Sequence, residues 1–236
     1  MKLMQEGGSK IVGLQSVTLN SPDVTATECA YDRLFGDCAG TEYTTGAVNI
    51  VEAAGAGATG ITFCVDAFSS VVELLQRRGI ELTVQGHRAA ATMHGVEIGI
   101  VAANAFPAPS GDIAGIHHVV YMSANPDRAV ATLGARLGLD LRLDRTRIKG
   151  LRQLFFRCGQ GFVELVIAGD DPTADDQLWG IAWHSTDIDR THARLTDAGT
   201  EVSEVRAGRK PGTRVFTVKD TNLVVPTIII ESSPKP

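Results

Sequence analysis

The chain has 236 residues, of which 44% are hydrophobic and 6% aromatic, and its formal net charge is −5. This length allows one large domain or two domains of ordinary size, each with a buried core. Because acidic and basic residues are interspersed, no basic field is available for a phosphate backbone, and we expect no nucleic-acid partner.

The four cysteines form no C-x-x-C pair, and the first residues lack the apolar run of a secretory signal. No stretch approaches the roughly 18 apolar residues that a membrane-spanning helix needs. We therefore expect a cytoplasmic protein with no membrane partner. Neither a P-loop nor a G-x-G-x-x-G after a strand is present, which predicts no nucleotide cofactor.

Two pairs of similar segments indicate internal repeats. "GLQSV" from Gly13 and "GIHHV" from Gly115 each open an apolar strand, and each precedes a helix-like stretch that ends in "LFG" or "RLG". "GITFCVDAFSSVVELLQRRGIEL" from Gly60 is likewise similar to "GIAWHSTDIDRTHARLTDAGTEV" from Gly180. Each of these four units has the pattern of one strand, one helix, and two or three further strands. The repeats predict an α+β fold of four tandem βαβββ modules.

The units group into two halves. Residues 10–103 form the N-terminal half, residues 113–232 form the C-terminal half, and 104–112, rich in Pro, Gly and Ala, is the expected linker. In the third unit, a helix is predicted to begin with Asn125 as N-cap and Pro126 at its first position, and Gly138 ends it.

The last two units can be assigned in chain order. The expected strands are 115–122, 139–146, 151–159, 161–169, 179–185, 201–207, 213–220 and 224–231. Between the fifth and sixth of these, a helix from about 187 to 198 carries Ile188, Thr191, His192 and Leu195 on one face. We expect His192 to pack between this helix and the sheet.

Four βαβββ units with a "G-I-x-H-V" opening strand and a closing "VEL" strand resemble the vicinal oxygen chelate superfamily, which includes glyoxalases, extradiol dioxygenases, epimerases and bleomycin-resistance proteins. The resemblance implies two cupped, mixed-sheet domains of glyoxalase type. It also implies a small-molecule substrate, and a lyase, isomerase or ring-opening oxygenase activity. A divalent metal such as Fe, Zn, Mn, Ni or Mg is the cofactor that such a site takes.

In that superfamily the metal ligands lie on the first and last strands of paired units. Carried onto this sequence, these positions fall on His118 and Glu164 in the third unit, which would be metal ligands or catalytic residues. In the fourth unit they fall on Gly180 and near Thr227, neither of which is a suitable ligand. The N-terminal half offers no full set either, since its corresponding places are Ser16, about Glu52, Gly60 and 97–99.

Three interpretations of the His118 and Glu164 pair stay open. It is part of a metal site completed by water or by another residue, or a metal-free acid–base pair, or a merely structural strand contact. Adjacent strand residues point to opposite faces, so His117 is expected to face away from His118 and to pack under the helix. The alternative to an enzyme is a metal-free binding or sequestering protein of the bleomycin-resistance type.

Six residues are candidates for substrate binding. Arg209, Lys210 and Arg214 surround a Pro-Gly turn that could present cations to an anionic group. Trp183 and Phe156 could form an apolar wall, and His184 lies an even number of positions from Gly180, on the same strand face. Four units can complete two clefts within one chain, so the expected state is a monomer or a homodimer.

Overall fold

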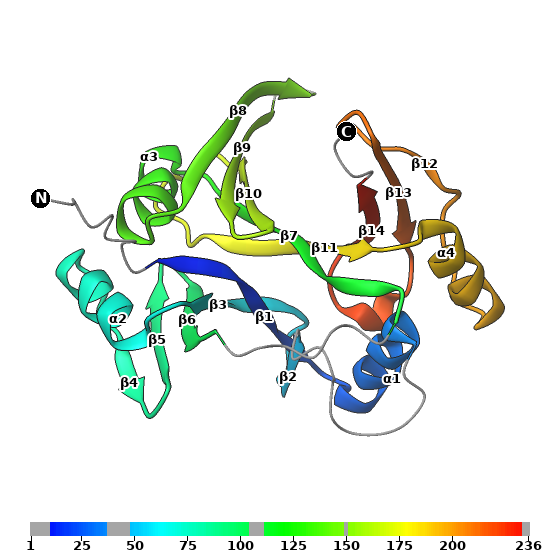
Figure 1. Ribbon diagram of the computed structural model, residues 1–236, viewed down its shortest axis with the longest axis horizontal. Helices are drawn as coiled ribbons and strands as arrows, with labels where there is room; N and C mark the ends of the chain where they lie inside the picture. Colours follow the sequence, from blue (N-terminus) through cyan, green and yellow to red (C-terminus); the bar gives the residue numbers. More distant parts are fainter. Residues whose placement is uncertain (1–9, 37–47, 104–110, 149–150, 233–236) are drawn as a thin grey trace, which may run out of the picture.

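The computed structural model describes residues 10–36, 48–103, 111–148 and 151–232. A mixed β-sheet runs through these residues, and in Figure 1 α2 and α3 lie at the left of its strands and α1 and α4 at the right. Its longest path has the strand order β4-β5-β6-β3-β11-β7-β10-β9-β8. The remaining strands branch from this path, with β1 and β2 next to β3, and β12, β13 and β14 next to β11.

The N-terminal half contributes six strands and two helices to the described residues. These are β1 (Ile11–Ser21), α1 (Val24–Phe35), β2 (Val48–Glu52), β3 (Gly57–Val65), α2 (Phe68–Arg77), β4 (Thr83–Gln85), β5 (Arg88–Met93) and β6 (Val96–Ala102). The first strands β1 and β3 pair antiparallel, and β2 and β6 lie parallel to them on the outside.

The C-terminal half repeats this arrangement with β7 and β11 at its centre. Its elements are β7 (Ile113–Ser123), α3 (Pro126–Val130), a π-helix (Ala131–Arg136), β8 (Asp140–Ile148), β9 (Leu151–Cys158), β10 (Gly161–Ile167), β11 (Gln177–Ser185), α4 (Ile188–Asp197), β12 (Arg206–Ala207), β13 (Thr213–Val218), a 3-10 helix (Thr221–Leu223) and β14 (Thr227–Ser232). In Figure 1, β8–β10 and β12–β14 stand on opposite sides of β7 and β11.

The helix starts follow from local sequence. Asp23, Asn125 and Asp187 each accept a backbone hydrogen bond in the first turn of α1, α3 and α4, as N-caps do. Gly138, with a φ of 74°, ends the third-unit helix as predicted. On α4, His192 lies at the predicted seam, with its ring edge against Phe216.

The predicted α+β fold of repeated units is therefore present, and most of the expected strands are too. The segment 201–207 differs, because only Arg206–Ala207 forms a strand there. The strands of the two halves are joined by pairing between Leu178 of β11 and Ala58 of β3, so they form one continuous sheet. The predicted linker lies largely outside the described residues, and the boundaries of the two halves stay a prediction. No described helix is long and apolar enough to cross a membrane.

Candidate functional site

His118 and Glu164 lie on neighbouring strands, on the sheet face turned away from the helices. On β7, His118 alternates with the fully buried core residues Val119 and Tyr121. On β10, Glu164 alternates with core residues in the same way, and the parallel register places His118 opposite Phe162. Because side chains alternate along a strand, both functional groups are kept out of the main core.

A chain of polar contacts runs through this face. The Gln153 Nε2 amide donates to Oε1 of Glu164 at 2.7 Å. The other carboxylate oxygen, Oε2, is 3.3 Å from Nε2 of His118. In turn, Nδ1 of His118 is 2.8 Å from Nδ1 of His117. The His118 and Glu164 side chains are 11% and 12% exposed, so the pair is largely screened from water and still reachable.

His117 faces His118, contrary to the prediction that it packs on the opposite face. The cause is a β-bulge: Ala182 pairs with His118 and Trp183 pairs with Ile116, so His117 has no partner in the ladder. An extra residue in one strand breaks the alternation of side chains. His117 consequently packs near Phe162 and His184, with ring centroids 6.0 and 6.3 Å away.

Burial makes His117 and His184 harder to protonate. It lowers the pKa of His117 to about 3, and the positive charges that His118, His184 and Lys210 can carry act in the same direction. Burial also lowers the pKa of His184, although the Glu231 carboxylate opposes this shift. The His117 ring is therefore a neutral hydrogen-bonding group at neutral pH.

The fourth unit presents no ligand opposite this pair. At Gly180 a Cβ would lie 2.8 Å from the carbonyl oxygen of Pro226, so the strand packing leaves no room for a side chain. Thr227 is on the core side, where its hydroxyl donates to the carbonyl of Val225. Its neighbour Ile228 packs with Ala182 on the inward face. At these two positions the fourth unit therefore offers no ligand, while His184 of β11 lies beside His117.

Among the described residues, the donor set falls short of a catalytic divalent metal site. Such sites use three protein ligands or more, and among the described residues no group of three His, Cys, Asp or Glu side chains could hold an ion. In the N-terminal half, the inward position Ser16 is buried and accepts a long hydrogen bond from Asn49, while Glu97 is exposed. His118 and Glu164 instead contact each other directly.

Two predicted substrate-binding residues lie in the main core. Trp183 is fully buried with its ring edge-on to Tyr31 and Phe35 of α1, at centroid distances of 6.2 and 5.0 Å. Phe156 is also fully buried, on the helix side of β9 beside Gly134. Both residues follow the strand alternation that sends them to the core, so neither can form a wall of the His118 face.

The three cations of the predicted basic turn have different environments. Arg214 makes two hydrogen bonds to the carboxylate of Asp189, at 2.6 and 2.7 Å, and lies 3.7 Å from Glu231, so its charge is already paired. Lys210 contributes to the electrostatic field at His117. Arg209 is exposed. Of the three cations, Lys210 is the one whose positive charge helps to lower the pKa of His117.

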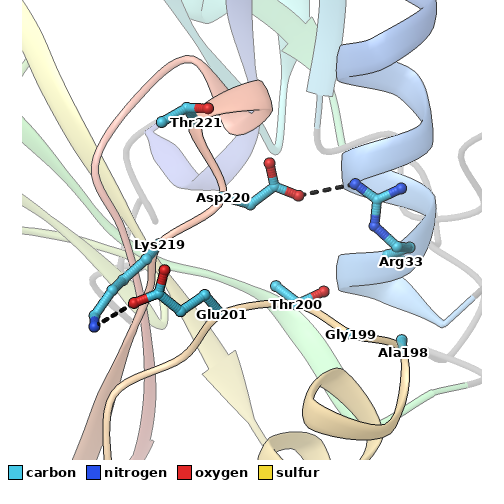
Figure 2. Close-up of a pocket in the computed structure, with 8 residues that line it drawn as sticks. All are labelled: Arg33, Ala198, Gly199, Thr200, Glu201, Lys219, Asp220 and Thr221. Atoms are coloured by element: carbon cyan, nitrogen blue, oxygen red, sulfur yellow. Dashed lines mark hydrogen bonds and ion pairs between the residues drawn. The ribbon is translucent and has the colours of Figure 1, made fainter.

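A separate depression of about 370 Å³ lies at the junction of the two halves (Figure 2). Arg33 of α1 faces the loop after β13 and pairs with Asp220 at 2.8 Å, and Lys219 pairs with Glu201 at 2.6 Å. None of the predicted site residues lines it. The four charged side chains that line this depression form ion pairs with one another. The depression therefore offers no chemistry comparable to that of the His118 face.

Sequence reasoning missed Gln153 and assigned His117 to the wrong face. For Gln153 a signal existed: the Cys158–Gly161 hairpin sets the antiparallel register of β9 and β10, which places Gln153 beside Val166, next to Glu164 on the same face. For His117 the only local signal is Gly115, whose φ of 135° favours glycine and accompanies the irregular strand.

The family model for the Glyoxalase/Bleomycin resistance protein/Dioxygenase superfamily matches residues 117–217. No curated protein matches the sequence. Among solved structures, a mutant of 4-hydroxymandelate synthase from Streptomyces coelicolor is 12% identical, with a TM-score of 0.73 over 96% of this chain and 95% of that one.

Two further structures share the fold. The Mn(II)-bound glyoxalase from Novosphingobium aromaticivorans is 15% identical, with a TM-score of 0.72 over 94% of this chain and 83% of that one. The 2,2',3-trihydroxybiphenyl 1,2-dioxygenase from Sphingomonas wittichii is 11% identical, with a TM-score of 0.73 over 94% and 91%.

These likenesses define a glyoxalase-like α+β protein built from tandem βαβ modules along the whole chain. The segment 117–217, which contains His117, His118 and Glu164, belongs to the glyoxalase/bleomycin resistance/dioxygenase superfamily. The resemblance inferred from the opening and closing strands of the third unit is thereby confirmed.

Proposed function

We propose that the protein is an acid–base enzyme that moves a proton on a small oxygenated substrate at His118 and Glu164. The observation that carries this proposal is the direct contact of the two side chains, 3.3 Å apart, on the inward face. A carboxylate and an imidazole within hydrogen-bond reach are the usual partners in proton transfer from carbon.

Glu164 is the better candidate for the base. Both ring nitrogens of His118 already have partners, Glu164 at Nε2 and His117 at Nδ1. A carboxylate has about four lone-pair sites, and the contacts from Gln153 and His118 use two of them. Glu164 therefore keeps acceptor capacity for a substrate proton, while His118 and Gln153 hold its orientation.

The proposed step is an enolisation. The C–H bond next to a substrate carbonyl breaks, its proton passes to a carboxylate oxygen of Glu164, and its electron pair forms the enolate. Returning the proton to a neighbouring carbon or to the opposite face completes an isomerisation or epimerisation. The proton transfer needs no oxidant, reductant or second substrate, and the groups that move the proton all belong to this chain.

The test is hydrogen exchange on a panel of small 2-oxo acids and α-hydroxy ketones in D₂O, followed by ¹H NMR. We expect catalysed exchange for at least one compound, and a loss of roughly 10²- to 10⁴-fold in Glu164→Gln and His118→Ala. His87→Ala, at an exposed position outside the site, serves as the matched histidine control and should exchange like the unmodified protein. Equal rates in all four proteins would refute the proposal.

A binding protein is the second candidate, favoured by Gly180 and Ile228, which stand at or next to the fourth-unit positions where ligands were expected. In that case a panel compound would raise the melting temperature without any exchange of its protons. Its binding would be sensitive to substitution of Ile228 and insensitive to Glu164→Gln.

A further inference from the structure

His117 occupies a position in which it can control the chemistry of its neighbour. The bulge in β7 brings Nδ1 of His117 to 2.8 Å from Nδ1 of His118, a distance typical of a hydrogen bond. One of the two nitrogens must carry the proton and the other must accept it. The identity of the donor decides which tautomer His118 adopts.

The other contact of His118 resolves this choice. A carboxylate only accepts hydrogen bonds, so the Nε2 atom of His118, 3.3 Å from Glu164 Oε2, must carry a proton for the contact to be favourable. Neutral imidazole has one N–H, so Nδ1 of His118 is then an acceptor. His117 must therefore donate from its own Nδ1.

We propose that His117 is a positioning residue that fixes the tautomer of His118, so that the nitrogen of His118 beside Glu164, Nε2, is the protonated one. This inference rests on the acid–base function proposed above and adds a residue to it. The protons then all lie in one direction: His117 donates to His118, the protonated Nε2 of His118 stands 3.3 Å from Glu164, and Gln153 donates to Glu164 from the other side.

Losing the donor at 117 has a defined consequence. Without it, Nδ1 of His118 has no recorded partner, and the ring is free to populate the Nδ1–H tautomer. The bare Nε2 lone pair would then face the carboxylate oxygens of Glu164, which is repulsive, and the general base would lose its orientation. Partners that orient an active-site histidine typically contribute roughly 10- to 100-fold to function.

Two variants separate the hydrogen bond from the shape of the ring. His117→Phe keeps an aromatic ring beside Phe162 and His184 but has no N–H. His117→Asn keeps an amide N–H donor close to the place of Nδ1. Long-range ¹H–¹⁵N NMR of the histidine rings at about pH 8, above the ordinary imidazole pKa, reports the tautomer directly, and the chain has only 6 histidines to assign.

We expect the Nε2–H tautomer for His118 in the unmodified protein and in His117→Asn, and a shift toward Nδ1–H in His117→Phe. The exchange rate should fall roughly 10-fold in His117→Phe through kcat, with KM unchanged, and recover in His117→Asn. An Nδ1–H tautomer of His118 in the unmodified protein would overturn the inference even if His117→Phe did not fold. So would an unchanged tautomer in a folded His117→Phe.

The NMR measurement is independent of turnover. If the tautomer pattern is as expected but no compound exchanges its protons, the acid–base function fails while the positioning role of His117 stands. If exchange depends on Glu164 and His118 but the tautomer is unaffected by substitution at 117, the positioning role fails alone.

Discussion

The carbonyl oxygen of Pro226 accepts a hydrogen bond from the N–H of Ile181 at 3.0 Å, and it lies 2.8 Å from the point where a Cβ on Gly180 would stand. The residue type at 180 is thus set by the approach of the backbone before β14 to β11. The position where the superfamily resemblance expects a ligand is closed to any side chain.

Replacing Gly180 with alanine should therefore destabilise the fold. We expect Gly180→Ala to lower the free energy of unfolding by ~1–3 kcal/mol, because a backbone carbonyl cannot move aside as a flexible side chain can. Urea denaturation measures this. Gly55→Ala is the control, since a Cβ there meets nothing within 4 Å, and it should change stability by less than ~0.5 kcal/mol. Equal effects of the two substitutions would contradict the steric explanation.

The neutral, buried His117 should make stability depend on pH. Its pKa is about 3 in the folded protein, whereas an unfolded histidine has a pKa of about 6.5. Between these values the unfolded chain binds more protons, so stability is complete above about pH 6.5 and falls as the pH decreases toward 3, by up to ~1.4 kcal/mol per pH unit.

His117→Asn removes this titration. Urea unfolding of both proteins between about pH 7 and pH 4 should show the unmodified protein losing stability faster than the variant. His184 and the carboxylates titrate in both proteins, so their contributions cancel in the comparison. Parallel stability curves would show that His117 is not buried as described.

Arg194 joins the two halves. Its guanidinium contacts both carboxylate oxygens of Asp112, at 3.0 and 2.7 Å, and the carbonyls of Arg33 and Leu34 at the end of α1. Because the Asp112 side chain is only 3% exposed, Arg194→Met would leave a buried carboxylate unpaired. We expect a loss of ~3–5 kcal/mol in unfolding free energy.

The matched control is Arg77→Met. Arg77 pairs with Glu73 at 3.9 Å, and both side chains are about 70% exposed, so its loss should change stability by less than ~0.5 kcal/mol. Chemical denaturation of both variants gives the comparison. A small effect at 194 would contradict the expectation that the Asp112 carboxylate depends on Arg194 for its pairing.

Tyr121 should stabilise the fold through its hydrogen bond to the buried carboxylate of Asp176. Its hydroxyl donates to Asp176 at 2.8 Å, and the Arg128 guanidinium donates to the other oxygen at 2.6 Å. Tyr121→Phe leaves that carboxylate short of one donor, so we expect a loss of ~1.5–3 kcal/mol by calorimetry or denaturation. The double variant with Asp176→Asn should cost less than the sum of the single substitutions; strict additivity would mean the contact contributes nothing.

Much of the fold was accessible to sequence reasoning because its signals are local. The helix start at Asn125 and the helix end at Gly138 depend only on a few neighbouring residues. The constant spacing between the repeats assigns each strand of one unit to the corresponding strand of another. The same register selected His118 and Glu164. The residue type of Trp183 favours a pocket wall, but its position on the strand alternates onto the core face, where it is fully buried.

The sequence by itself determined the repeated units, the family resemblance and the pair of residues at the centre of the site. Only the tertiary structure decided that His117 turns toward His118, that Gln153 completes the contact chain, and that Pro226 excludes a side chain at 180. The physical reason is that bulges and close approaches arise from pairing between strands distant in sequence, whereas periodicity describes one strand at a time.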